Sequence, residues 1–200
     1  MDMDYEGPDA DYLIDTTDIY EQTVYENIRV QNDEWEIIDE SEAAPYLPDT
    51  TTKRKVTIGL QENRKEVPLS RFDSVLLDDY FELRKGHLLN TGGSIWGLDF
   101  VPKGPADKDD KTSSIQYLAV AGLRGTTDQE HFGLNTIQPT GTYKNAIQLW
   151  RLKLSTKQAP ERARLDMCLL HDFGVICDLR WCPYGVFEDE NVKRINIKTE

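Results

Sequence analysis

Cysteine, histidine and long hydrophobic runs are scarce in this 200-residue sequence, which has three cysteines and three histidines. An odd and small number of cysteines does not suit a framework of paired disulfides, so we expect a reducing, intracellular setting. No segment approaches the roughly 18 consecutive apolar residues that cross a bilayer. The first residues, MDMDYEGPDADY, lack the basic and apolar regions of a secretory signal. We therefore expect no membrane partner.

Basic residues are almost missing from residues 1–50, which hold 16 Asp and Glu but only one basic residue, Arg29. This composition predicts an acidic, disordered tail over residues 1–50. Aromatic and aliphatic residues are interspersed among the acidic residues of the tail. Two roles for the tail therefore remain open: it folds onto a partner, or it only keeps the chain soluble. Because such a tail repels phosphate, we expect any contact with DNA to be indirect.

The remaining residues predict an all-β region with generous loops, since helical periodicity is nearly absent. Residues 51–91 are expected to form a strand and a connecting segment. Within them, residues 67–81 fit either a short strand with a turn or a brief helix. From residue 92 to residue 200 the pattern is clearer, and it predicts strands over residues 94–102, 115–123, 146–154, 165–173 and 175–183.

An internal repeat relates the first and last of these predicted strands. Ile, Leu, an aromatic residue and Pro coincide at the first, fourth, sixth and eighth positions of residues 95–102 and 176–183, which are 81 residues apart. Repeats of about 40–45 residues, each forming four strands, are typical of WD-repeat propellers. The long loops at 103–114 and 124–145 account for most of the extra length. We therefore expect about one full propeller blade plus the first strand of the next.

The predicted blade departs from the common WD pattern at two positions. Trp150 lies in IQLWRL, which has the shape of the strand that names the repeat, but Arg151 replaces the usual Asp. Lys144 stands where an Asp is expected six residues before the Trp, and His171 lies near the place of the usual Gly-His pair. The usual hydrogen-bond network of Asp, His, Ser or Thr, and Trp is therefore expected to be incomplete.

The stretch CLLHDFGVICDLRWCPYG, residues 168–185, holds the most reactive side chains of the chain. His171 and Asp172 are adjacent and would point to opposite faces of a strand, so they do not form a base and its orienting acid. Cys177 and Cys182 would also lie on opposite faces, and Cys168 and His171 do not complete a set of four converging zinc ligands. We predict no catalytic, cofactor-binding or metal-ligating residues, buried cysteines, and a packing role for Trp181.

Other polar candidates also favour a structural role. Residues 90–94, NTGGS, lack the spacing of a phosphate-binding loop. Asp107, Asp109 and Asp110 lack the twelve-residue calcium pattern. His87 and His131 have no acid or cysteine at a persuasive spacing. The basic residues at 52–55 are expected to be solvated rather than to contact nucleic acid.

Four stretches in this order resemble the WD-repeat subunit of transcription factor IIIC, the factor called tau in yeasts. They are HLLNTGGSIWGLDFVP, QYLAVAGL, NAIQLWRL and LLHDFGVICDLRWCPYG, which lie between residues 87 and 185. The resemblance implies a nuclear, non-catalytic scaffold subunit with no cofactor and no small-molecule substrate. It also implies contact with other subunits of the factor, especially a second WD-repeat subunit, in transcription of transfer-RNA genes by RNA polymerase III.

Two alternatives remain beside this expectation. One is a WD-repeat adaptor in another nuclear or cytoplasmic complex. The other is a small all-β hydrolase that uses His171 with an acid. The sequence disfavours this alternative, because no Ser or Cys nucleophile is expected in a strained turn near a base.

Overall fold

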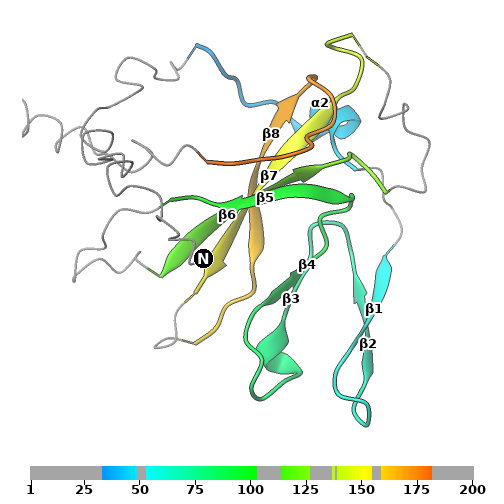
Figure 1. Cartoon of the computed structure of the whole chain (residues 1–200), viewed down its shortest axis with the longest axis vertical. Coiled ribbons are helices and arrows are strands. Elements are labelled where there is room, and N and C mark those ends of the chain that lie inside the picture. The colour runs from blue at the N-terminus through cyan, green and yellow to red at the C-terminus, as the bar shows by residue number, and fades with distance from the viewer. Residues whose placement is uncertain are drawn as a thin grey trace, which may run out of the picture. The chain divides into compact units, whose positions relative to one another are not determined.

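The computed structural model describes residues 33–48, 53–102, 114–126, 137, 139–154 and 159–181. Almost all of them belong to one unit, Glu36–Trp181, which is described here by itself. The unit is mostly β-structure and contains two hairpins and one larger sheet (Figure 1). None of the helices in the described part of the chain has the length and apolar character that crossing a bilayer requires.

The larger sheet has four antiparallel strands in the order of the sequence. They are β5 (Ile95–Phe100), β6 (Ile115–Gly122), β7 (Asn145–Lys153) and β8 (Arg164–His171). Each corresponds to a strand predicted from the sequence, and the all-β class is confirmed for these residues. The order also means that the three strands following β5 lie side by side, as the predicted repeat requires.

Two hairpins precede the sheet. In the first, β1 (Arg54–Ile58) pairs with β2 (Lys65–Leu69), and in the second, β3 (Ser74–Leu76) pairs with β4 (His87–Leu89). A short 3-10 helix, η3 (Leu77–Asp79), follows β3, so residues 67–81 contain features of both predicted alternatives, a short strand and a brief helical turn. The prediction of one strand and a connecting segment over 51–91 missed β2 and β4.

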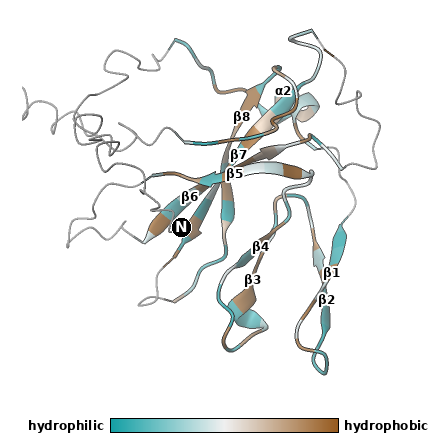
Figure 2. Cartoon of the chain, viewed as in Figure 1, coloured by the Kyte–Doolittle hydropathy of each residue, from teal (hydrophilic) through white to brown (hydrophobic). Residues whose placement is uncertain are grey.

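The hairpins share a hydrophobic core of their own. Ile58, Leu69 and Val75 are its buried centre, and Val56 and Val67 pack against it. Figure 2 shows β1 mainly in hydrophilic colours, because only one of its faces contributes to this core. The solvent face carries Lys55, which forms an exposed ion pair with Glu66. The predicted solvation of these basic residues therefore agrees with their exposure.

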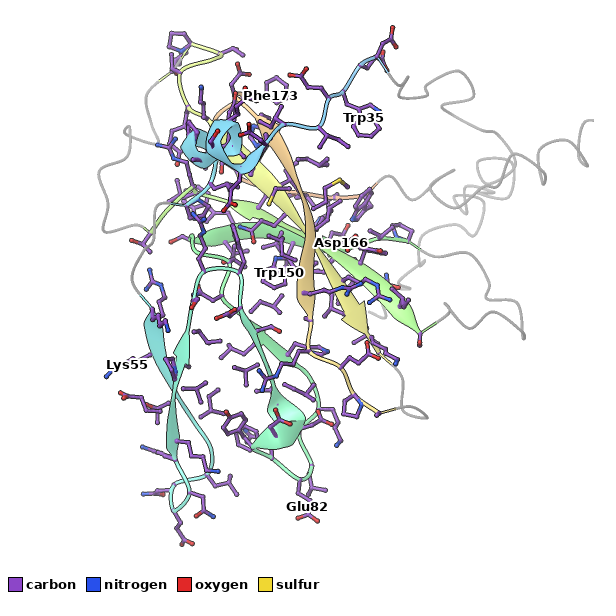
Figure 3. All side chains as sticks on the ribbon, turned by 180° about the vertical axis from the view of Figure 1, so that it is seen from behind. Trp35, Lys55, Glu82, Trp150, Asp166 and Phe173 are labelled. Atoms are coloured by element: carbon purple, nitrogen blue, oxygen red, sulfur yellow. The ribbon has the colours of Figure 1, made fainter. Side chains whose placement is uncertain are left out.

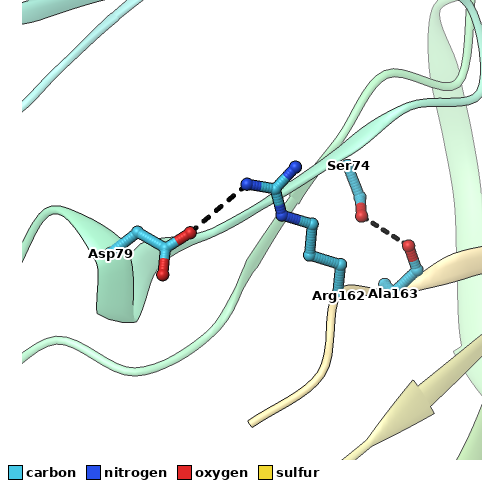
Figure 4. A network of polar contacts seen from close by, with 4 residues as sticks. All are labelled: Ser74, Asp79, Arg162 and Ala163. Atoms are coloured by element: carbon cyan, nitrogen blue, oxygen red, sulfur yellow. Dashed lines mark hydrogen bonds and ion pairs between the residues drawn. The ribbon is translucent and has the colours of Figure 1, made fainter.

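The second hairpin is fastened to the chain just before β8. The Ser74 hydroxyl donates a hydrogen bond to the backbone oxygen of Ala163, and Arg162 lies 3.5 Å from the Asp79 carboxylate (Figure 4). Only the first of these contacts is buried, so it is the one expected to contribute stability, since exposed ion pairs contribute little. Phe72 and Leu89 add apolar contacts to the core of the sheet.

Helical structure occurs within the stretch predicted to be a disordered tail. A short helix, α2 (Glu40–Ala43), is capped by the Asp39 side chain, which accepts a hydrogen bond from the Glu42 backbone N–H at 2.9 Å. A 3-10 turn, η2 (Ala44–Tyr46), follows it and reaches β7. The prediction of disorder is therefore wrong for these residues, because a cap and a docking surface offset the acidic composition. Residues 1–32 lie outside the described part of the chain.

Candidate functional site

One face of the large sheet is filled by a row of apolar side chains centred on Trp150. Cross-strand pairing places Phe100, Leu118, Trp150 and Leu165 in this row. Trp150 is fully buried in this row, and Figure 3 labels its side chain on the sheet. A tryptophan buries a large apolar area, so this residue is expected to dominate the packing of the sheet.

The polar end of Trp150 is satisfied by a buried glutamine. The indole Nε1 donates to Gln148 Oε1 at 3.0 Å, and Gln148 Nε2 donates to the backbone oxygen of Thr91 at 2.8 Å. Thr91 lies in the loop that leads into β5. One glutamine side chain and a main-chain carbonyl therefore connect β7 to the loop that enters the sheet.

Asn145 forms a second polar joint at the start of β7. Its side chain is 3% exposed and donates to the backbone oxygens of Gly122, at 2.8 Å, and Gly174, at 3.2 Å. Gly122 ends β6, and Gly174 begins the segment that follows β8. The side-chain amide of Asn145 therefore holds together the end of β6 and the segment that follows β8.

The segment after β8 returns to the first strand of the sheet. The backbone N–H of Trp181 donates to Asp99 Oδ2 at 2.9 Å, and its indole N–H donates to the Asp99 backbone oxygen at 3.3 Å. A Cβ at Gly97 would lie 3.0 Å from the Leu179 Cβ, so only glycine allows the segment to approach this closely. Residues 175–181 thus lie on β5, one repeat after it.

The predicted strand over 175–183 is not a strand in the residues described, which end at Trp181. Ile176 donates a backbone hydrogen bond to Gly122, at 3.4 Å, and the segment forms no regular ladder. Trp181 is half-buried and is held at Asp99 by the two hydrogen bonds given above, and its packing between blades stays a prediction.

His171 and Asp172 lie at the end of β8 and form no base–acid pair. His171 Nδ1 accepts a hydrogen bond from the Phe173 backbone N–H at 3.3 Å, and its Nε2 is buried without a hydrogen-bond partner among the described residues. Burial lowers the pKa of His171, and the Asp172 carboxylate opposes this shift. His87 resembles it, since burial lowers its pKa while Asp78 opposes. His131 lies outside the described residues.

The lowered pKa values of His87 and His171 predict that the free energy of unfolding depends on pH. A histidine whose pKa is lowered by folding contributes stability above its ordinary value of 6.5, and that stability is lost as the pH falls below it. We expect the midpoint of urea unfolding to fall between pH 7 and pH 5. The double variant His87→Gln/His171→Gln should show a flatter profile, and an unchanged profile would contradict the assignment.

The two cysteines that the structure describes, Cys168 and Cys177, are both free. Cys168 in β8 is partly buried and Cys177 is exposed, whereas Cys182 lies outside the described residues. The prediction of buried cysteines is therefore wrong for Cys177, because no strand encloses its segment. Burial raises the pKa of the Cys168 thiol to about 11, so it is a poor nucleophile. No group of three or more possible metal ligands occurs among the residues described.

Alkylation should distinguish the two described cysteines. In a Cys182→Ser background at pH 7, iodoacetamide is expected to modify Cys177 at least about ten-fold faster than Cys168, because the reactive species is the thiolate and burial disfavours it. Peptide mass spectrometry over time measures both rates. Similar rates in the native chain would show that Cys168 is not shielded, and equal rates in urea provide the control.

The remaining sequence candidates occupy structural positions. Residues 90–94 form the loop that receives Gln148, and Lys144 lies with its Nζ 4.9 Å from the centre of the Tyr46 ring. Arg151 is half-buried in β7 opposite Arg164 of β8. Asp107, Asp109 and Asp110 lie outside the described residues. The two polar joints at Gln148 and Asn145 were not predicted, because nothing in the sequence marks their main-chain partners.

The fold and its polar joints define a β-sheet unit in which polar side chains hold the strands and the neighbouring loops together. Comparison with known proteins then gives a more specific relationship. General transcription factor 3C polypeptide 2 of Homo sapiens is 30% identical over 164 residues, covering 77% of this chain and 16% of the relative, and its Pongo abelii counterpart matches equally. Transcription factor tau subunit sfc6 of Schizosaccharomyces pombe is 28% identical over 107 residues, covering 53% of this chain and 15% of the relative.

These matches relate the chain to subunits of transcription factor IIIC, as the resemblance implied. The chain spans about one sixth of the length of these curated relatives. No protein-family model matches it.

Proposed function

We propose that this chain is a non-catalytic scaffold subunit of the transcription factor IIIC type. It supports transcription of transfer-RNA genes by RNA polymerase III through protein–protein contacts in the nucleus. The similarity to the human and fission-yeast proteins named above supports this assignment. Its partners are other subunits of the factor, especially a second WD-repeat subunit, and its contact with DNA is indirect.

The observation that carries the proposal is the return of the chain to β5 after four strands. In a WD-repeat propeller each blade has four strands, and the next blade begins beside the first strand of the last. Trp181 contacts Asp99, which lies 82 residues earlier in β5. The strands β6, β7 and β8 lie between these two residues in the sequence and follow β5 in the same order across the sheet. We assign β5–β8 as one blade and residues 175–181 as the inner segment that starts the next.

The face of the sheet on which residues 175–181 lie supports the same assignment. Pairing places Asp99, Ala119, Leu149 and Met167 in one row on the face that carries residues 175–181. Met167 and its neighbour on this face, Leu169, are 47% and 46% exposed. A second sheet laid on this face would bury both, which is the packing that adjacent propeller blades use.

Among the residues described, neither His171 nor Cys168 has the arrangement that the hydrolase alternative requires. A hydrolase would need a base and a nucleophile that converge and have suitable pKa values. Here His171 Nδ1 accepts a hydrogen bond from the backbone N–H of Phe173, two residues away. The raised pKa of Cys168 keeps its sulfur protonated at neutral pH.

Affinity purification of the tagged full-length chain tests the proposal. We expect other transcription factor IIIC subunits and transfer-RNA gene chromatin to co-purify. The variant Met167→Asp/Leu169→Asp should reduce their recovery, whereas Leu83→Asp should not, because Leu83 is already 91% exposed away from this face. Recovery of a different complex would favour the WD-repeat adaptor, and recovery of no subunit would contradict the assignment.

A further inference from the structure

Residues 40–48, which we call the strap, pass over a surface formed by three cationic side chains from separate parts of the chain. Arg71 lies between β2 and β3, Arg124 follows β6, and Lys144 precedes β7. We call this surface the seat. No function discussed above uses this surface.

The seat holds the main chain of the strap through charge-assisted hydrogen bonds. Arg124 donates to the backbone oxygen of Pro45 at 2.5 Å, and Arg71 donates to that of Pro48 at 2.5 Å. Lys144 lies over the ring of Tyr46, with 4.9 Å between its Nζ and the ring centre. Cationic donors make stronger hydrogen bonds than neutral ones, and a cation over a ring adds attraction.

The end of the strap also fits by shape. Pro48 is buried, and a Cβ at Gly92 would lie 2.9 Å from the Pro48 Cβ. Gly92 has a φ of +80°, which favours glycine, so the gap that receives the proline is set by the backbone. A bulkier residue at position 92 would close it.

Much of the seat is held in place without the strap. The Arg71 guanidinium lies over the Phe72 ring at 4.9 Å, and that of Arg124 lies over the Tyr143 ring at 5.4 Å. The Tyr143 hydroxyl also accepts a hydrogen bond from the Arg124 backbone N–H at 3.0 Å. A preformed arrangement lowers the ordering cost of binding and is expected of a ligand site rather than of a chance contact.

We propose that the seat is a peptide-binding site which the strap fills in cis. Its ligand is a short segment of proline, tyrosine, an aliphatic residue and proline, the sequence of residues 45–48, supplied in trans by a partner. Recognition rests on two backbone carbonyls, one aromatic ring and a buried proline. This inference does not depend on the proposed role in transcription.

The strap controls access to the seat by competition. Only residues 49–52 join Pro48 to the part of the chain that leads into β1, so the strap acts at an effective concentration on the order of millimolar. A free peptide with an intrinsic Kd of about 10 μM would then bind roughly a hundred-fold more weakly while the strap is in place. The partner segment therefore gains the seat when the strap is released or outcompeted.

Fluorescence anisotropy with a labelled peptide of residues 36–48 tests the proposal on the full chain. In the emptied variant Pro45→Ala/Tyr46→Ala/Pro48→Ala we expect binding at least ten-fold tighter than in the wild-type chain. Adding Arg124→Ala/Lys144→Ala should remove that gain, whereas adding Arg162→Ala, which alters an exposed ion pair elsewhere, should not. Equal binding by the wild-type and emptied chains, or binding indifferent to Arg124 and Lys144, would overturn the proposal.

A cut chain keeps the test decisive if the emptied variant fails to fold. A protease recognition site placed in residues 49–52 allows the strap to be severed while every residue of the seat is retained. The labelled peptide should then exchange into the seat, and the same peptide with Tyr46 and Pro48 replaced by alanine should not. A cut chain that never takes up the labelled peptide would overturn the proposal.

Discussion

Replacing Trp150 by alanine is expected to destabilise the sheet by about 3–5 kcal/mol, the range typical of large aromatic side chains removed from a core. The side chain is fully buried, lies opposite Leu118 of β6, and is packed with Leu165 of β8. Removing it leaves a cavity between three strands. Urea unfolding of the full chain, followed by circular dichroism, measures the loss.

Trp150→Phe is the matched control, because it keeps much of the apolar volume but removes the indole N–H. Gln148 Oε1 would then lose its donor, and its Nε2 would still be held by Thr91. We expect a smaller loss, about 1–3 kcal/mol, which is the usual effect of leaving a buried polar group unpaired. If both variants unfold at the wild-type urea concentration, Trp150 is not the centre of the core.

Replacing Gly122 by alanine is expected to destabilise the chain by about 3 kcal/mol, since a side chain there overlaps the backbone of β5. The added Cβ would lie 2.9 Å from the Trp96 nitrogen and still closer to the backbone oxygen of Ser94. That oxygen accepts the hydrogen bond of Leu123, so the clash also removes a joint between β5 and the end of β6. The strand β6 cannot move away freely, because it is paired on both sides.

Urea unfolding again provides the measurement for Gly122→Ala. Ser94→Ala is the control, because it shortens the side chain of the same neighbour without adding an atom near its carbonyl. We expect it to change the free energy of unfolding by less than about 0.5 kcal/mol. Equal stability of Gly122→Ala and the wild-type chain would mean that β5 and β6 approach less closely than the structure has them.

The two central strands of the large sheet, β6 and β7, could be predicted because burial leaves a local signal in the sequence. The stretch around Leu118 and Val120 is continuously apolar, and β7 alternates about Trp150. The hairpin strands β2 and β4 were missed, since β2 carries Pro68 and exposed charges, and β4 has only three residues. Local composition does not reveal strands that gain stability mainly from a partner.

The polar joints could not be predicted from the sequence for a different reason. Gln148 bonds to a main-chain carbonyl 57 residues away, and Asn145 to the carbonyls of two glycines. Backbone acceptors exist at every residue, so the sequence does not mark which of them a side chain will meet. The strap was predicted to be disordered for the same reason, because its acidic composition gives no sign of the distant Arg124.

The internal repeat relates Ile95 to Ile176, and the structure brings the segment after β8 back onto β5. The strand predicted over residues 175–183 is not formed in the part of the segment that the structure describes, because residues 175–181 have no ladder partner among the described residues. A strand needs a neighbour to complete its hydrogen bonds, and similarity to another strand does not supply one.

Formation of a disulfide between residues 97 and 179 tests most directly whether the chain returns to β5 one repeat later. In a background with Cys168, Cys177 and Cys182 replaced by serine, Gly97→Cys and Leu179→Cys would place two Cβ positions about 3.0 Å apart. The added side chain pushes residues 175–181 slightly away from β5, which brings this separation to the 3.5–4.5 Å of natural disulfides. Mild oxidation should give an intramolecular disulfide in nearly every molecule, detected by mass spectrometry after alkylation without reductant. Two free thiols in the folded, oxidised chain would contradict the account.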